Sequence, residues 1–190
     1  MASIQEQERY LYAKLSKFAY DDVKERAEAT IPYGYEYDAA HSTDEIAVFV
    51  NYTLRKVAIV ARGTSLDKAA IKDLSTDALV ALGVTPMANR TYDLRTKVRQ
   101  VQRRYRGFEI TLSGHSLGGT LADIVGHEFN LKTITFNQGS TPLKLYGVEE
   151  RLTGIDEKSR KVIRYKVAGD AVSMWQSTND DQYFPQYAHA

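Results

Sequence analysis

Ile110-Thr111-Leu112-Ser113-Gly114-His115-Ser116-Leu117-Gly118-Gly119 is the stretch of sequence that decides the fold. It reads as an apolar strand, then Gly-x-Ser-x-Gly, then a helix that begins at once. In this pattern a serine sits on a tight strand-to-helix turn, with its hydroxyl exposed above a sheet. The turn needs glycine on both sides because the backbone is strained there and neighbouring elements approach closely. The sequence therefore predicts a nucleophile elbow at Ser116.

The helix that follows Ser116 supplies free backbone N–H groups and a partial positive charge where an oxyanion would form. The amide of Leu117, directly after the serine, is the first donor that we expect in an oxyanion hole. The second donor is expected from a loop after an early strand, where Thr64 follows an almost wholly apolar run. The Thr64 hydroxyl could donate as well.

The whole-chain composition limits the classes of protein to consider. With 190 residues the chain is long enough for a substantial core, and we expect a single domain over residues 1–190. A net charge of +1 gives no case for a nucleic-acid-binding protein at the level of the whole chain. Cysteine is absent, and no cluster of His, Asp and Glu suggests a metal, so we expect no metal and no other cofactor.

The N-terminal residues lack the apolar core of a secretory signal, and no run is long enough to span a bilayer. From these two features we expect a soluble protein, with the cytoplasm favoured. The sequence leaves the oligomeric state open.

Apolar periodicity outlines an alternation of helices and strands along the chain. Helices are predicted over residues 4–20, 66–74, 94–105 and after Ser116, and strands over 46–50, 56–61, 110–113, 131–136 and 161–167. Residues 21–45 are mixed and tyrosine-rich, and residues 75–94 are interpreted as a surface excursion. The alternation predicts an α/β fold of the α/β-hydrolase kind, with a mostly parallel central sheet flanked by helices.

In such a sheet, functional residues gather where the strands end at their C-termini. Thr64, Ser116 and Asp170 each follow the C-terminal end of a predicted strand. This agreement is the best support for a site beyond the serine motif itself.

A serine hydroxyl is a weak nucleophile and needs a nearby base, usually a histidine steered by a carboxylate. The hydrolase order is Ser, then Asp or Glu, then His. His41 lies upstream of Ser116 and has the wrong order. His115 precedes the serine on a sharp turn, and it is interpreted as a packing residue.

His127 comes 11 positions after Ser116, which along a helix is about 16 Å and too far to take a proton. Its i−4 neighbour Asp123 is interpreted as a local partner that supports the helix. His189 remains as the candidate base, in the right order and free to fold back over the sheet. The alternative for His189 is a frayed terminal residue.

Asp170 is the candidate acid because it sits just past a strand, in a Gly-Asp turn. Asp156 and Glu157 precede that strand, which places them at the wrong edge of the sheet. Asp180 and Asp181 lie in a polar stretch with no strand to fix them. The alternative for Asp170 is a solvated turn residue.

At these positions the chain resembles the class 3 lipases, the fungal triacylglycerol lipase group of the α/β-hydrolases. The residues that carry the resemblance are Val60-Ala61-Arg62-Gly63-Thr64, Asp73-Leu74, the run from Leu112 to Ala122, Thr135-Phe136 with Gly139, and Gly169-Asp170-Ala171-Val172. The similarity covers roughly residues 46–175, with the candidate histidine beyond it.

The resemblance implies Ser116 as nucleophile, Asp170 as triad acid and His189 as base. It implies Thr64 and Leu117 as oxyanion donors, and ester hydrolysis through an acyl-enzyme. The expected substrate is a lipid or small ester, with a transient contact to a membrane surface allowed and no nucleic acid expected.

Two departures from the family pattern bear on the substrate. Ala70 occupies what looks like the position of a lid tryptophan in better-known lipases, so residues 66–74 form only a weak interfacial binder. Asn137-Gln138-Gly139 replaces a more typical Gly-x-Pro after the Thr-Phe strand. A soluble esterase or acyl-transfer enzyme with the same triad is therefore the near alternative to a lipase.

A different class of function is suggested by one face of the predicted helix over residues 94–105. Its basic residues are Arg95, Lys97, Arg99, Arg103, Arg104 and, just beyond, Arg106. This face predicts either a peripheral membrane or nucleic-acid binder, or a solvated helix face. The solvated face is favoured because the net charge is near neutral.

Overall fold

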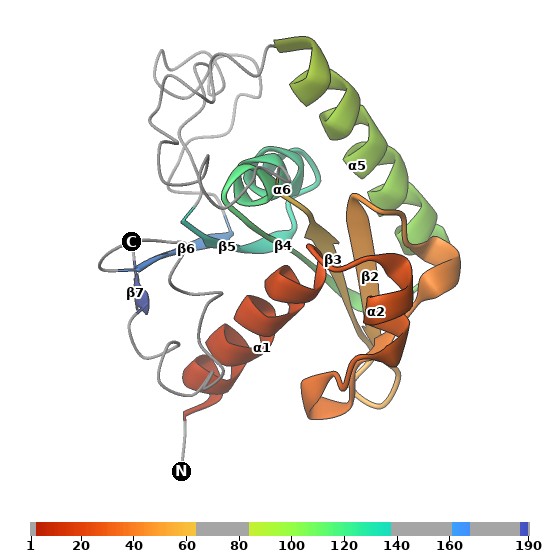
Figure 1. The fold of residues 1–190 in the computed structure, drawn as a ribbon, viewed down its shortest axis with the longest axis vertical. Helices are drawn as coiled ribbons and strands as arrows, with labels where there is room; N and C mark the ends of the chain where they lie inside the picture. Colours follow the sequence, from red (N-terminus) through yellow and green to blue (C-terminus); the bar gives the residue numbers. More distant parts are fainter. Residues whose placement is uncertain (1–2, 64–83, 138–160, 168–186, 190) are drawn as a thin grey trace.

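The computed structural model describes residues 3–63, 84–137, 161–167 and 187–189 of the chain (Figure 1). Thr64, Asp170 and the helix predicted over residues 66–74 lie outside the described residues. The helices are α1 (Ile4–Phe18), α2 (Val23–Glu28), α5 (Val84–Arg104) and α6 (Leu117–Glu128), with short 3-10 turns η1 (Pro32–Gly34) and η2 (Ala39–His41). The strands are β1 (Glu36–Tyr37), β2 (Ile46–Asn51), β3 (Lys56–Ala61), β4 (Glu109–His115), β5 (Lys132–Phe136), β6 (Val162–Val167) and β7 (Tyr187–His189).

These strands form one sheet in the order β1-β2-β3-β4-β5-β6-β7. The neighbours from β3 to β6 all pair in parallel, whereas β1, β2 and β7 add antiparallel edges. The parallel strands need crossover connections, and α6 supplies one between β4 and β5. The predicted α/β fold with a mostly parallel central sheet is confirmed.

The core lies on both faces of the sheet, as Figure 1 shows with α1 on one side and α5 and α6 on the other. Successive strand residues point to opposite faces, so β3 sends Ala58 and Val60 toward α1 and Val57 and Ile59 toward α5 and α6. A strand buried on both faces needs apolar residues throughout. This requirement explains the nearly continuous apolar sequence of β3.

The N-terminal helix α1 packs on the sheet through Leu11, Tyr12 and Leu15. A capping box between Ser3 and Glu6 begins the helix, since each side chain accepts a hydrogen bond from the backbone amide of the other residue. The amphipathic helix predicted for this region is therefore confirmed, ending at Phe18.

The short helix α2 was not expected within the mixed region over residues 21–45. It begins with a second capping box, Asp22 with Glu25, and buries Arg26 completely. The Arg26 guanidinium donates to four backbone carbonyls, those of Phe18, Ala19, Thr43 and Asp44. Arg26 thereby joins the C-terminal end of α1 to the segment that leads into β2.

Helix α5 begins earlier in the chain than the apolar periodicity of the sequence predicted. The interpretation of residues 75–94 as a surface excursion is wrong for its second part, because the helix already begins at Val84. Pro86 lies in the first turn, where a missing N–H costs no helical hydrogen bond. The predicted apolar face is present, with Leu94, Val98 and Val101 buried against the sheet.

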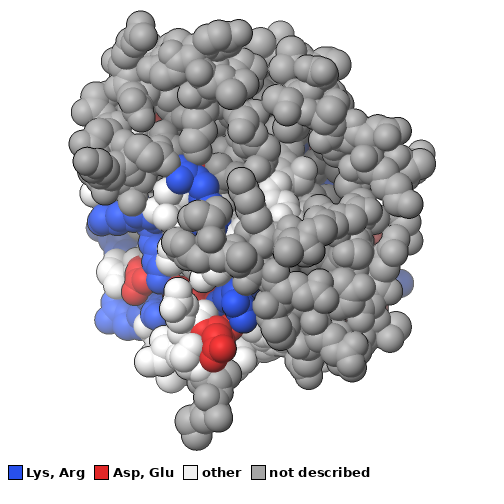
Figure 2. All heavy atoms as spheres, turned by 90° about the vertical axis from the view of Figure 1, so that its left-hand side faces the viewer, with Lys and Arg blue, Asp and Glu red and all other residues white. Residues whose placement is uncertain are grey.

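Ion pairs link the helices to one another and to the sheet. Lys132 of β5 binds Glu8 of α1 at 2.6 Å, and Arg164 of β6 binds Asp123 of α6 at 2.9 Å. Figure 2 shows described acidic side chains lying beside basic ones on the face turned toward the viewer. The described part of that face therefore mixes both signs of charge.

Candidate active site

Ser116 occupies the turn between β4 and α6, as the motif predicted. Its backbone has φ 55° and ψ −124°, a left-handed conformation that side chains other than glycine adopt at a cost of roughly 1–3 kcal/mol. Two backbone hydrogen bonds hold it there, from the Ser116 amide to the carbonyl of Phe136 and from the amide of Thr120 to the carbonyl of Ser116. The serine is partly exposed, and its hydroxyl does not cap α6.

The glycines of the motif are required by close approach of the backbone. A Cβ on Gly114 would lie 2.7 Å from the backbone nitrogen of Gly119, one turn into α6. A Cβ on Gly118 would collide with the carbonyl group of Ala61 at the end of β3. Gly114 therefore lets the helix fold back tightly after the serine, and Gly118 lets the helix approach the neighbouring strand.

Leu117 begins α6, and its side chain is buried in the core on that face of the sheet. Helix geometry leaves the first N–H groups of α6 without carbonyl partners inside the helix. The amide of Leu117 is one of them, next to the serine, as an oxyanion donor must be. The buried side chain fixes the amide while the helix dipole favours negative charge at this end.

The loop that leads to Thr64 is described as far as Gly63, and it lies beside the elbow. A Cβ on Gly63 would be 3.1 Å from the carbonyl oxygen of His115. Arg90 of α5 donates a hydrogen bond to the backbone carbonyl of Arg62 and forms an ion pair with Glu45. The backbone amide of Arg62 donates to the backbone carbonyl of Glu45. Thr64 thus follows a described residue that touches the turn holding Ser116.

His115 is a packing residue, as its place in the motif predicted. Its side chain is buried, and Nδ1 lies 2.9 Å from the hydroxyl of Tyr20. Burial lowers the pKa of His115 from its ordinary value near 6.5 to about 4. The imidazole is therefore neutral at pH 7, and it packs edge to face against the ring of Tyr20.

Two further histidines lie away from the serine. His41 Nδ1 is 2.8 Å from Asp38 Oδ2. The same carboxylate oxygen accepts a hydrogen bond from the hydroxyl of Tyr105, which lies a few residues before β4. His127 is buried near the C-terminal end of α6, as the spacing along the helix predicted. Its proposed pairing with Asp123 stays a prediction, and Arg164 is one partner of that carboxylate.

His189 lies in β7, which pairs with β6 so that His189 faces Tyr165 across the strands. Tyr165 is opposite Phe136, which is opposite His115 in β4. His189 is therefore level with the elbow but three strands away, about 14 Å at the usual strand spacing of about 4.8 Å. The register alone does not bring His189 to Ser116, and its role as base remains to be tested.

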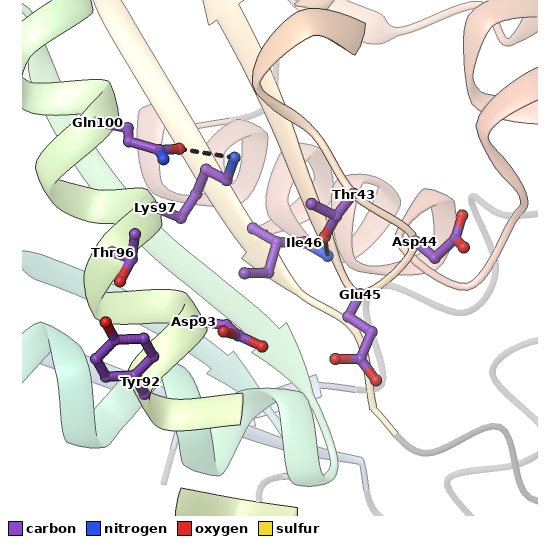
Figure 3. Close-up of a pocket in the computed structure, with 9 residues that line it drawn as sticks. All are labelled: Thr43, Asp44, Glu45, Ile46, Tyr92, Asp93, Thr96, Lys97 and Gln100. Atoms are coloured by element: carbon purple, nitrogen blue, oxygen red, sulfur yellow. Dashed lines mark hydrogen bonds between the residues drawn. The ribbon is translucent and has the colours of Figure 1, made fainter. Parts of the chain in front are cut away.

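A polar cavity of about 460 Å³ lies between α5 and the segment before β2 (Figure 3). Figure 3 shows the side chains of Glu45 and Asp93 extending into it from opposite walls. The residues that line it are Thr43, Asp44, Glu45, Ile46, Tyr92, Asp93, Thr96, Lys97 and Gln100. None of these lining residues comes from residues 114–119, so this cavity is separate from the elbow.

The basic face of α5 is engaged with the rest of the molecule at several points. Arg95 forms two hydrogen bonds of 2.5 Å with Glu128 of α6. Arg99 lies over the ring of Phe129 at 5.6 Å, and Arg104 over that of Tyr105 at 5.0 Å.

Among the described residues, none of the helices is long and apolar enough to span a membrane. The described His, Asp and Glu side chains form no group suited to a metal ion.

A model of the Tle-like phospholipase domain, within the phospholipase-like families, matches residues 12–189 of the chain. The chain belongs to this family. The matched range includes every residue that the sequence analysis singles out as a candidate site residue, from Thr64 to His189. It also includes Tyr20 and Arg26, which the sequence patterns did not single out as functional residues.

This Tle-like domain is also similar to one curated protein and to several solved structures. It is 30% identical over 117 residues to the uncharacterized protein RP165 of Rickettsia prowazekii, covering 59% of this chain and 28% of that protein. The chain therefore spans little more than a quarter of that relative. Lipase II from Rhizopus niveus matches with a TM-score of 0.58 and 15% identity, over 96% of this chain and 94% of the lipase.

A second solved lipase has a similar fold to the Tle-like domain. It is a triacylglycerol lipase described as having a serine protease triad as its catalytic centre, and it matches with a TM-score of 0.57 and 16% identity. The alignment covers 96% of this chain and 94% of the lipase. At this level of identity the likeness shows the fold, and the predicted resemblance to the class 3 lipases is confirmed as a likeness of fold.

Proposed function

We propose that the domain is a serine hydrolase that cleaves carboxylic esters of lipids through an acyl-enzyme, with Ser116 as nucleophile. The single observation that carries the proposal is the left-handed backbone of Ser116 at the N-terminal end of α6. The site retains this strained conformation on a non-glycine residue, and its hydroxyl does not cap the helix. This conformation supports the proposal, because a nucleophile elbow holds its serine on such a strained strand-to-helix turn.

In the proposed mechanism His189 accepts the hydroxyl proton of Ser116 as Oγ attacks the ester carbonyl carbon. Asp170 orients the imidazole and stabilises its charge. The carbonyl oxygen becomes an oxyanion that the amides of Leu117 and Thr64 stabilise. Collapse of this intermediate breaks the ester bond, the alcohol leaves with the proton from His189, and water then hydrolyses the acyl-enzyme to the free acid.

His189 is retained as the proposed base because the environments of the other histidines do not suit the role. His115 is buried with a lowered pKa, His41 binds Asp38, and His127 lies about 16 Å along α6 from the serine. A base must come within about 3 Å of the proton that it takes. The proposal therefore requires His189 to approach Ser116 from the position it has in β7.

The family favours phospholipids as the first lipid esters to test. Turnover of phosphatidylcholine vesicles and of short-chain p-nitrophenyl esters should be measured for the wild type, Ser116→Ala and Ser113→Ala. Ser113 is the matched control, because its buried hydroxyl donates to the carbonyl of Ile134 and faces away from the site. We expect Ser116→Ala to lose turnover and Ser113→Ala to keep it. Turnover that survives in Ser116→Ala would overturn the proposal.

The second candidate is a soluble esterase with the same triad, favoured by Ala70 at the place of a lid tryptophan. The two candidates differ in how activity depends on the physical state of the substrate. A lipase with interfacial activation gains activity when the ester exceeds its solubility limit, whereas an esterase saturates below it. Rates across that limit separate the two.

A further inference from the structure

Tyr20 is a residue that the proposed mechanism does not use, although it contacts the elbow from a distant part of the chain. It follows the end of α1, and its hydroxyl lies 2.9 Å from Nδ1 of His115. The two rings meet edge to face with centroids 5.8 Å apart. Tyr20 therefore touches the residue directly before the nucleophile.

The same hydroxyl also touches the loop that carries the proposed second oxyanion donor. A Cβ on Gly63 would collide with that hydroxyl and lie 3.0 Å from Cζ of Tyr20. The residue at position 63 must therefore be glycine for the phenol to sit between Gly63 and His115.

Two contacts join the Tyr20 hydroxyl to His115. The acceptor at good distance is His115 Nδ1 at 2.9 Å, since the carbonyl oxygen of His115 is at 3.4 Å. Burial keeps His115 neutral, so Nδ1 can accept when the ring hydrogen is on Nε2. In the other tautomer Nδ1–H donates to the Tyr20 hydroxyl, which donates to the carbonyl oxygen of His115, so the phenol is tied to His115 in both cases.

We propose that Tyr20 is a positioning residue that fixes Gly63 relative to His115. In sequence Gly63 directly precedes Thr64, the proposed second oxyanion donor, and His115 precedes Ser116 and Leu117. The inference rests on the proposed function, because it assigns to Tyr20 a role in aligning the donors named there. Oxyanion donors act only when they are held in place before the reaction, so their spacing affects the rate.

Tyr20 is itself held firmly, as a positioning residue must be. Its amide donates to the carbonyl of Lys17, and the two carbonyls just before it, those of Phe18 and Ala19, accept from the buried guanidinium of Arg26. The phenol is therefore fixed to the end of α1 rather than carried on a loose segment. Arg26 extends this support to the segment before β2.

Tyr20→Phe removes the hydroxyl that lies against Gly63 and bonds with His115, and it keeps the ring. We expect kcat for a p-nitrophenyl ester to fall about tenfold with KM changed less than about twofold, because the alignment matters in the transition state. The matched control is Tyr12→Phe, on the preceding helix α1, whose buried hydroxyl bonds with Tyr35 and with Thr111 near the start of β4. We expect this control to keep the wild-type kcat.

A spectroscopic signature separates this role from general stabilisation. In the folded protein labelled with ¹⁵N-histidine, the Nδ1 resonance of His115 should report the hydrogen bond with the Tyr20 hydroxyl. Tyr20→Phe should shift the Nδ1 resonance, whereas Tyr12→Phe should leave it unchanged. This measurement does not depend on catalytic activity.

The outcomes distinguish the inference from the function on which it rests. A wild type that hydrolyses no ester and does not react with a fluorophosphonate removes the proposed function, and the role of Tyr20 with it. If the wild type turns over, an unchanged kcat in Tyr20→Phe overturns the inference alone. Equal losses of kcat in Tyr20→Phe and Tyr12→Phe, or an unshifted His115 Nδ1 resonance, also overturn it.

Discussion

Gly118 lies so close to Ala61 that a Cβ on the glycine would be 2.9 Å from the carbonyl carbon of Ala61. The first turn of α6 therefore rests directly on the end of β3. This contact joins the elbow to the strand that leads into the loop carrying the proposed second oxyanion donor. The arrangement of the site thus depends on residue 118 being glycine, with no side chain.

Gly118→Ala should displace the end of β3 from the first turn of α6. The added methyl group would press on the backbone of β3, which cannot move aside as a flexible side chain can. We therefore expect the free energy of unfolding to fall by about 1–3 kcal/mol. Turnover should fall with it, because the two oxyanion donors move apart. Urea unfolding and ester hydrolysis check the two effects. A variant with wild-type stability and turnover would show that the close contact is not required.

Arg26→Met should destabilise the fold strongly although the site is distant. The side chain is wholly buried, and its loss removes the donor to four backbone carbonyls. A buried acceptor that loses its partner costs about 1–3 kcal/mol, so we expect a total of at least about 3 kcal/mol. Lys24→Met on the exposed side of the same helix is the control, with a change of about 0.5 kcal/mol or less. Equal unfolding free energies for the two variants would contradict this account.

His115 should make stability depend on pH. Burial lowers its folded-state pKa to about 4 from an ordinary value near 6.5, so between these values the unfolded chain binds more protons than the folded chain. The stabilisation is complete above about pH 6.5 and is lost as the pH falls toward 4. For a shift of this size the loss is roughly 3 kcal/mol. We expect wild type to lose that much more than His115→Gln between pH 7.5 and 4, by urea unfolding at each pH. Parallel curves for the two proteins would exclude the effect.

His189→Ala should abolish turnover while leaving the free energy of unfolding almost unchanged. The expectation follows from its proposed role as base. It requires His189 to reach Ser116 although β7 lies three strands from β4. His41→Gln is the control, since His41 binds Asp38 near the start of β4. Turnover that persists in His189→Ala would assign the base to another group.

The elbow and the central strands could be predicted from the sequence because their signals are local. The Gly-x-Ser-x-Gly spacing and the apolar run of β3 each follow from one element. The contact between Tyr20 and His115 could not be predicted, because it joins residues 95 positions apart and no periodicity encodes it. The burial of Arg26 could not be predicted either, because its four carbonyl partners come from segments on both sides of α2, although Asp22-x-x-Glu25 has the spacing of a capping box. The early start of α5 was missed because Pro86 suggested a break in the helix.

The central claim is that Ser116 is an activated nucleophile. Intact-mass and peptide mass spectrometry after incubation with a fluorophosphonate test this claim most directly, for wild type and Ser116→Ala at neutral pH. We predict a single phosphonyl adduct on Ser116 of the wild type and none on the variant. An unlabelled wild type, or an adduct that persists in Ser116→Ala, would contradict the claim.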